Sequence, residues 1–214
     1  LRRGRTPESY RESLEAVVAE AEQMTELVED LLMLARSDQA IAAIARTTVD
    51  LRVVLQDVCA QMEPLAEARD IRILRRFRAE DFTFVGSSPM LHRLFVLLID
   101  NALKYSNPKG EIVVTLDQSG GDLCASVEDH GTGIAADDLE HIFKRFYRAD
   151  KARSGGGHGL GLPLAQSIVQ AHGARIEVIS REGSGSIFRV VFPNVTPESA
   201  RTIAGINGDA VPAA

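Results

Sequence analysis

Two polar side chains of complementary chemistry lie three residues apart in the segment "LLIDNALKYS" (97–106). Asn101 and Lys104 would share one face of a helix, one turn apart. The amide oxygen of Asn101 suits Mg²⁺, the ammonium of Lys104 suits phosphate oxygens, and Tyr105 adds an aromatic face. The segment fits a metal–phosphate site as well as it fits a turn-capping asparagine beside a solvated lysine.

A second segment, "VEDHGTGI" (127–134), predicts a strand that ends in an acidic residue followed by two glycines. Asp129 can accept a hydrogen bond from an exocyclic amine such as that of adenine, and Gly131 and Gly133 allow close backbone approach. The letters "GTGIAA" also match the dinucleotide-binding pattern G-x-G-x-x-A. That interpretation is disfavoured because the segment follows an antiparallel hairpin, far into the chain.

A third segment, "GGGHGLGL" (155–162), contains five glycines in eight residues. It does not spell G-x-x-x-x-G-K-[ST], which excludes a P-loop. The apolar helix that follows would offer unpaired backbone N–H groups and a positive dipole end, so the segment predicts an anion site. A flexible linker is the alternative, although linkers seldom lead directly into an apolar helix. A fourth segment, "GSGSIFRVVFP" (183–193), predicts a hairpin strand and no more.

The elements that must position these segments alternate irregularly between helices and hairpins. Strands are predicted at 47–50, 71–77, 82–85, 111–117, 122–128, 174–181 and 185–192, and helices at 51–68, 88–105, 135–143 and 160–172. This order favours an α+β two-layer sandwich over a doubly wound parallel sheet. The tail at 194–214 is small, polar and spaced by Pro and Gly, so it is predicted to be disordered.

Residues 7–38 predict one long helix with an apolar seam. The seam repeats at a period of 3.5 residues, which suits packing in a helical bundle. The alternative is an amphipathic helix lying on its own domain. The seam residues are Leu14, Val17, Ala21, Met24, Val28, Leu31 and Ala35.

Bulk composition excludes several classes of protein. The net charge of −6 argues against nucleic-acid binding as the main function. No apolar run approaches the roughly 20 residues that cross a bilayer, and no signal-peptide pattern is present. Cys59 and Cys124 lack metal-ligand spacing and lie in apolar patterns, which favours buried free thiols in a reducing compartment.

In their order and spacing, the motifs resemble the catalytic part of a sensor histidine kinase of two-component systems, over about residues 5–193. "DNALKYS" resembles the family's N box, "EDHGTGI" its G1 box, "IFKRFYRAD" (142–150) its F box, "GGGHGLGL" its G2 box and "GSGSIFRVVF" its G3 element. The helix ending in "LVEDLLMLARSD" resembles the second helix of the dimerisation and phosphoacceptor hairpin. The resemblance implies a Bergerat-type fold, a mixed sheet with helices on one face, as in type II topoisomerases and heat-shock chaperone ATPases.

The resemblance also implies ATP and Mg²⁺ as cofactors and assigns roles by position. Asn101 would hold Mg²⁺, Lys104 would contact phosphate and Tyr105 would lie near the base. Asp129 would bind the adenine amine. Arg148 would contact the γ-phosphate, although a solvated charge explains it nearly as well. The other nucleotide-binding residues would be Gly131, Gly133, Gly157, His158, Gly159, Leu160 and Gly161, the last five in or beside a mobile lid.

Two departures from the family pattern stand out. Leu97 occupies a position where the kinases usually have asparagine and the water-splitting relatives have glutamate. Leucine cannot act as a general base, so slow hydrolysis is expected. The second departure is the missing acceptor signature His-Glu-x-x-x-Pro. No histidine is followed by an acidic residue; the five are His92, His130, His141, His158 and His172.

The predicted organisation is therefore a partial hairpin at 1–40, a catalytic ATP-binding domain at 41–193 and a tail at 194–214. We expect a fragment that transfers the γ-phosphate of ATP to a histidine upstream of Leu1, for relay to a response regulator receiver domain. The resemblance implies homodimerisation through the hairpin, no nucleic-acid partner, and a cytoplasmic location within a membrane-anchored parent. The alternatives are an ATPase of the same fold and a non-catalytic dimerisation module.

Overall fold

A computed structural model describes residues 46–78, 82–149 and 158–193, together with individual positions between 10 and 32. The helices named within the three continuous stretches are α3 (Leu51–Glu67), α4 (Ser88–Tyr105), α5 (Ala136–Leu139) and α6 (Gly161–Ala171). The strands are β1 (Thr47–Asp50), β2 (Arg72–Phe77), β3 (Thr83–Gly86), β4 (Glu111–Ser119), β5 (Asp122–Asp129), β6 (Arg175–Arg181) and β7 (Gly185–Phe192).

The main sheet is mixed and runs in the order β2-β4-β5-β7-β6. Strand β2 pairs with β4 in parallel, whereas the remaining pairs are antiparallel. Strands β1 and β3 form a separate two-stranded sheet. The predicted α+β class and the antiparallel pairing of β4 with β5 are both confirmed, and a doubly wound parallel sheet is ruled out.

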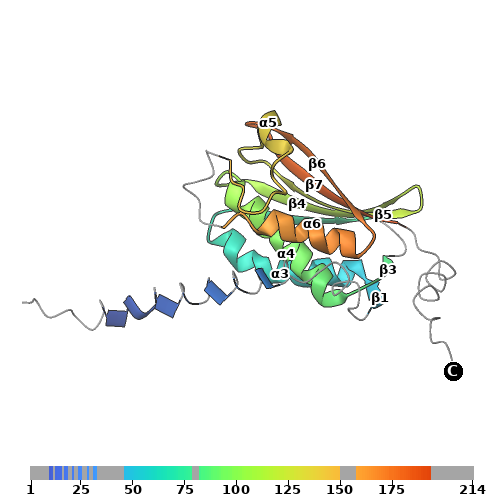
Figure 1. The fold of residues 1–214 in the computed structure, drawn as a ribbon, viewed down its shortest axis with the longest axis horizontal. Coiled ribbons are helices and arrows are strands. Elements are labelled where there is room, and N and C mark those ends of the chain that lie inside the picture. The colour runs from blue at the N-terminus through green and yellow to red at the C-terminus, as the bar shows by residue number, and fades with distance from the viewer. Residues whose placement is uncertain are drawn as a thin grey trace, which may run out of the picture.

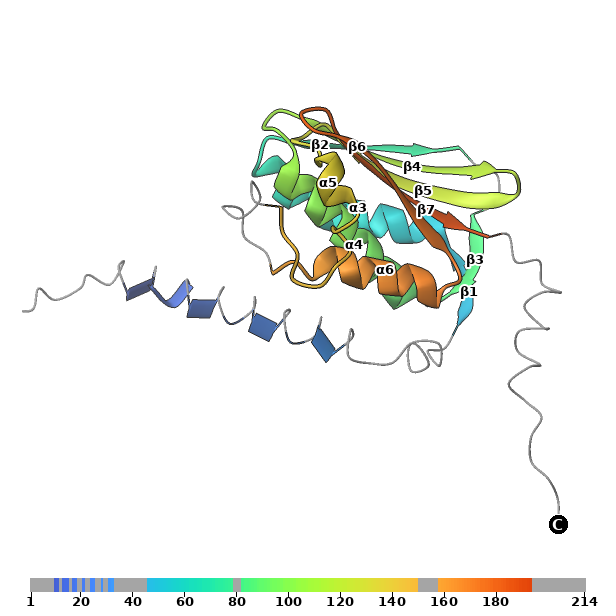
Figure 2. The same ribbon diagram turned by 45° about the horizontal axis from the view of Figure 1, so that its top comes forward.

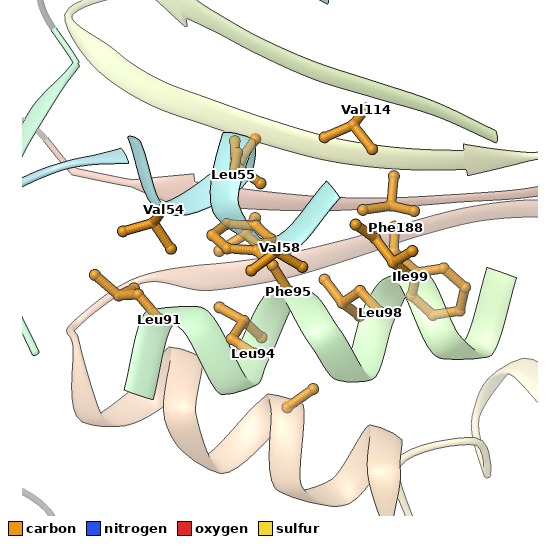
Figure 3. Close-up of a cluster of buried hydrophobic side chains, with 14 of the residues drawn as sticks. Val54, Leu55, Val58, Leu91, Leu94, Phe95, Leu98, Ile99, Val114 and Phe188 are labelled. Carbon is orange, nitrogen blue, oxygen red and sulfur yellow. The ribbon is translucent and has the colours of Figure 1, made fainter. Parts of the chain in front are cut away.

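Helices α3, α4 and α6 lie together against one face of the main sheet (Figures 1 and 2). Successive residues of β4 explain this layering. Ile112, Val114 and Leu116 are fully buried, whereas Thr115 and Asp117, which point to the other face, are half-exposed. Figure 3 shows the resulting core, in which side chains of α3 and α4 meet Val114 and Phe188 of the sheet.

Helix α4 is the element that carries the first predicted motif to its position. Ser87 precedes the helix in extended conformation and Pro89 lies in its first turn, where its missing N–H costs nothing. The buried positions then follow helical spacing toward the core. They are Met90, Leu91, Leu94, Phe95, Leu98, Ile99, Ala102 and Leu103. The helix ends at Tyr105, so Asn101 and Lys104 lie in its last turns.

Helix α5 is shorter than predicted. The expected helix over 135–143 ends at Leu139, and a series of turns follows it. The carbonyl of Asp138 accepts hydrogen bonds from the N–H groups of both His141 (2.8 Å) and Ile142 (3.1 Å), and the carbonyl of His141 accepts from Lys144 (2.8 Å). These bonds, two of which span only three residues, replace the regular helical ladder and turn the chain toward the next motif.

The described positions between Tyr10 and Leu32 are all helical, in agreement with the predicted long helix. Its described apolar side chains are solvent-exposed, from 39% at Leu31 to 65% at Leu14 and Val17. Ala35 and the tail at 194–214 lie outside the described residues. Among the residues the structure describes, no helix combines the length and apolar character needed to cross a membrane.

Candidate functional site

The last turns of α4 present three of the predicted residues together. Asn101 and Tyr105 are half-buried and Lys104 is exposed. The Lys104 Nζ lies 2.5 Å from Asp100 Oδ2, an ion pair across one helical turn. Asp100 was not among the predicted site residues, although its i, i+4 spacing from a lysine could have indicated the pair.

The acidic end of β5 is the most deeply buried polar group of the site. Asp129 is 3% exposed, and its Oδ1 accepts a hydrogen bond of 2.9 Å from the Gly131 N–H. Burial raises the pKa of Asp129, while the N–H groups of Gly131 and Ser186 act in the opposite direction. A carboxylate offers about four acceptor positions, so these two donors leave capacity for a ligand amine.

The loop after Asp129 is joined directly to the end of α4. The Thr132 N–H donates to the Tyr105 carbonyl at 3.1 Å, and the Asn107 side-chain amide donates to the His130 carbonyl at 3.0 Å. A Cβ at Gly131 would overlap the Tyr105 carbonyl oxygen, so only glycine allows this approach. The N-box and G1-box motifs, predicted separately, therefore form one continuous surface.

The same loop also packs on the turn between β6 and β7. Gly133 has a φ of +64°, and a Cβ there would overlap the carbonyl oxygen of Arg181. The Gly183 N–H donates to the Thr132 carbonyl at 2.7 Å. The G3 element by itself predicted only a hairpin. In the structure its turn packs against residues 130–134, the loop after Asp129 that we call the G1 loop.

The predicted anion-binding element lies at the start of α6. Leu160 is 2% exposed and precedes the helix, and within the described residues its side chain makes no capping bond to the first turn, where backbone N–H groups lack helical partners. A Cβ at Gly161 would lie 3.6 Å from Leu97 Cδ2 of α4, which places this end of α6 beside the N-box helix. His158 is exposed, and Gly157 lies outside the described residues.

The F-box segment is tied to the same end of α6. The Phe146 N–H donates to the Gly159 carbonyl at 2.9 Å, and the Tyr147 hydroxyl donates to Asp138 Oδ1 at 2.5 Å. The side chain of Phe146 is 63% exposed, and Arg148 is half-buried two residues further on. Backbone contacts therefore connect the F box to the G2 box, and a phosphate role for Arg148 stays a prediction.

The donor set at Asn101 fits Mg²⁺ held mainly by a bound phosphate. Within the part of the chain that the structure describes, the Asn101 amide makes no hydrogen bond, and no cluster of three His, Cys, Asp or Glu side chains could hold a metal alone. Mg²⁺ commonly takes one or two protein oxygens and completes its shell with phosphate and water. The Asn101 amide oxygen provides one such ligand.

Comparison with known protein families identifies the family to which this fold belongs. The family of histidine kinase-, DNA gyrase B- and HSP90-like ATPases matches residues 86–196, from the end of β3 to just beyond β7. The chain belongs to this family. Helix α4, the loop after Asp129 and helix α6 all lie within the matched residues.

The similar proteins include a sensor protein and a sensor histidine kinase. The chain is 37% identical over 196 residues to the sensor protein IrlS of Burkholderia pseudomallei and 35% identical over 188 residues to the sensor histidine kinase YkoH of Bacillus subtilis. These matches cover 90% and 87% of the chain but only 41% and 40% of the relatives, so the chain spans about two-fifths of their length.

Solved structures agree with this assignment. Full-length ShkA in complex with AMPPNP matches with a TM-score of 0.73 at 26% identity, covering 89% of the chain and 40% of that protein. The histidine kinase AdeS of Acinetobacter baumannii matches with a TM-score of 0.70 over 86% of the chain and 84% of that structure. At 23% identity, the second match supports the fold alone.

Proposed function

We propose that this chain is the ATP-binding catalytic part of a two-component sensor histidine kinase, using Mg·ATP to phosphorylate a histidine outside these 214 residues. The convergence of Asn101, Asp129 and the open first turn of α6 carries the proposal. The buried carboxylate suits an adenine amine, and the helix N-terminus suits phosphates. The name of the relative YkoH, a sensor histidine kinase, favours this use of the site over other uses of the fold.

The proposed mechanism assigns each side chain one task. Asp129 accepts from the adenine amine and so orients the nucleotide, while Lys104 neutralises phosphate charge. Asn101 would hold Mg²⁺, which would supply positive charge to neutralise the transferred group. The acceptor ring nitrogen forms a bond to the γ-phosphorus as the bond to the bridging oxygen of ADP breaks.

The apolar contact at Leu97 favours transfer to a histidine over transfer to water. Leu97 lies beside Gly161, where α4 meets the start of α6, and its side chain has no group that could deprotonate water. A water-splitting ATPase would require another base at this position. Appreciable phosphate release by the isolated chain would support the ATPase alternative.

The wider assembly is also proposed. The exposed apolar side chains between Leu14 and Leu32 suit a helical dimer, and a response regulator receiver aspartate would accept the phosphate from the histidine. As the resemblance implies, this part would work in the cytoplasm within a membrane-anchored parent.

Incubation with γ-labelled ATP tests the direction of transfer. The chain alone should bind nucleotide without acquiring acid-labile label, because no histidine in it is followed by an acidic residue. Label should appear on an added polypeptide that carries the histidine helix of the same kinase. Stable acid-labile label on the isolated chain would contradict the external acceptor, and no label on either polypeptide would contradict the kinase assignment.

A further inference from the structure

His172, at the end of α6, is a buried titratable group outside the nucleotide site. It is 5% exposed and its ring bonds to two separate helices. The Ser87 N–H, before the first turn of α4, donates to Nε2 at 3.1 Å, and Nδ1 lies 2.8 Å from the Ile168 carbonyl. A backbone N–H can only donate, so Nε2 is the acceptor and Nδ1 carries the proton. The ring is therefore neutral.

The surroundings leave the ring little freedom. A Cβ at Gly86 would lie 2.9 Å from His172 Cδ2, and the Phe84 ring centroid lies 6.2 Å from that of His172. Arg46 donates to the neighbouring Ala171 carbonyl, which places a positive charge near the ring. Burial first, and then Arg46, lower the pKa of His172, whereas the Ile168 carbonyl acts in the opposite direction.

The two helices joined by His172 run antiparallel and carry the site at their other ends. Leu97 of α4 approaches Gly161 at the start of α6, while Ser87 before α4 contacts His172 at the end of α6. Eleven residues of α6 span about 16 Å at 1.5 Å per residue. A change in the angle between α4 and α6 at the His172 end would therefore move the first turn of α6 relative to Asn101.

We propose that neutral His172 is a positioning residue for the nucleotide, because it joins the start of α4 to the last turn of α6 and so fixes the first turn of α6 relative to Asn101. This inference rests on the proposed ATP site. The acceptor at Nε2 is the decisive feature, since the Ile168 bond stays within α6 and the Ser87 bond connects the two helices.

Matched substitutions separate these two bonds. Gln can place an acceptor oxygen near the position of Nε2, whereas Asn reaches only the position of Nδ1 and keeps the bond within α6. With the 214-residue chain and Mg²⁺, titration with a non-hydrolysable ATP analogue should give near wild-type affinity for His172→Gln. Affinity should fall at least about tenfold for His172→Asn and His172→Phe. His92→Phe, on the same α4 helix, is the control and should bind as wild type.

Acid pH provides a readout that packing alone would not change. The folded pKa lies below the ordinary value of 6.5, so the stabilisation from the Ser87 bond is complete above pH 6.5 and is lost as pH falls through the folded pKa. Analogue affinity of the wild type should fall across this window relative to His172→Gln, while urea unfolding checks that each variant remains folded.

The outcomes distinguish the two proposals. If wild type binds the analogue and folded His172→Phe binds equally well, the positioning role is wrong and the ATP site stands. Equal loss of affinity in the Gln and Asn variants would also overturn it, since the helix-joining acceptor would then not matter. If folded wild type binds no analogue, the ATP site itself is refuted, and the inference about His172 fails with it.

Discussion

Lys104 is held by a partner that a ligand could readily displace. Its side chain and that of Asp100 are 37% and 38% exposed, and the two groups are 2.5 Å apart within one helix. Exposed i, i+4 pairs contribute only about 0.3–0.5 kcal/mol, because water screens the charges. A polyphosphate carries far more charge than one carboxylate, so Lys104 can turn toward a bound triphosphate at little cost.

The substitution Lys104→Met should therefore weaken the binding of the ATP phosphates and leave the binding of the adenine base unchanged. We expect affinity for ATP to fall about tenfold, as for the loss of one charge-assisted hydrogen bond, while the stability of the chain changes by less than about 0.5 kcal/mol. Parallel titrations with ATP and adenosine measure this. Equal losses for the two ligands would show that Lys104 acts on the helix end rather than on phosphate.

The residue types at the site were predictable because each is unusual in its position. Asp129 ends a buried strand, and two glycines follow it within four residues. Nothing in the sequence signals that Ser186, from the distant strand β7, donates to that carboxylate, or that Asn107 holds the His130 carbonyl. Such contacts join segments whose proximity only the folded chain establishes.

At the scale of elements, the G1 loop contacts both a helix and a strand turn of the site. It contacts the end of α4 through Tyr105 and the β6–β7 turn through Gly183. Gly133 has no space for a side chain, whereas Gly120 in the β4–β5 turn has nothing within 4 Å of a Cβ. Their φ angles of +64° and +61° are nearly equal, which makes the two glycines a matched pair.

Alanine at these two positions separates backbone strain from steric overlap. Both variants should lose about 1 kcal/mol from positive φ, but Gly133→Ala should lose more, about 2–4 kcal/mol in total, and should also weaken ATP-analogue binding. Urea unfolding and titration of both variants measure this. If both variants lost the same stability and binding did not change, the backbone at Arg181 would be able to move away from the added Cβ without disturbing the G1 loop.

Element boundaries were predicted well where caps and periodicity agree. Helix α4 begins after Ser87, with Pro89 in its first turn, and ends at Tyr105, as its pattern indicates. Helix α5 ends four residues earlier than expected, because bonds to the Asp138 carbonyl turn the chain sharply. That turn also brings Tyr147 within hydrogen-bond distance of Asp138, a tertiary contact that local sequence does not encode.

Across the molecule as a whole, one core holds the site elements together. Phe188 of β7 is 1% exposed and lies with Ile99 and Leu98 of α4 (Figure 3). The fold class followed from the element order, but the strand order did not. Parallel pairing of β2 with β4 and the insertion of β7 between β5 and β6 join strands distant in sequence, whose register local pattern cannot give.

Phe188→Ala should destabilise the domain by about 3–5 kcal/mol, the cost of a large core cavity. Ile179→Ala is the control, because Ile179 is 59% exposed and a surface substitution should change stability by no more than about 0.5 kcal/mol. Urea unfolding followed by circular dichroism measures both variants. A small effect of Phe188→Ala would show that the stability of the domain does not depend on the packing of Phe188 against α4.

Calorimetric titration of the chain with Mg²⁺ and a non-hydrolysable ATP analogue is the decisive measurement for the ATP site. We expect one saturable site, weakened at least about tenfold by Asp129→Asn, because an amide has one acceptor oxygen where the Gly131 and Ser186 N–H groups and the proposed adenine amine together require a carboxylate. Glu128→Gln, one residue earlier on the opposite face of β5, should bind as wild type. Binding that Asp129→Asn leaves unchanged, or no heat and no thermal shift with folded wild type, would contradict a nucleotide site built on Asp129.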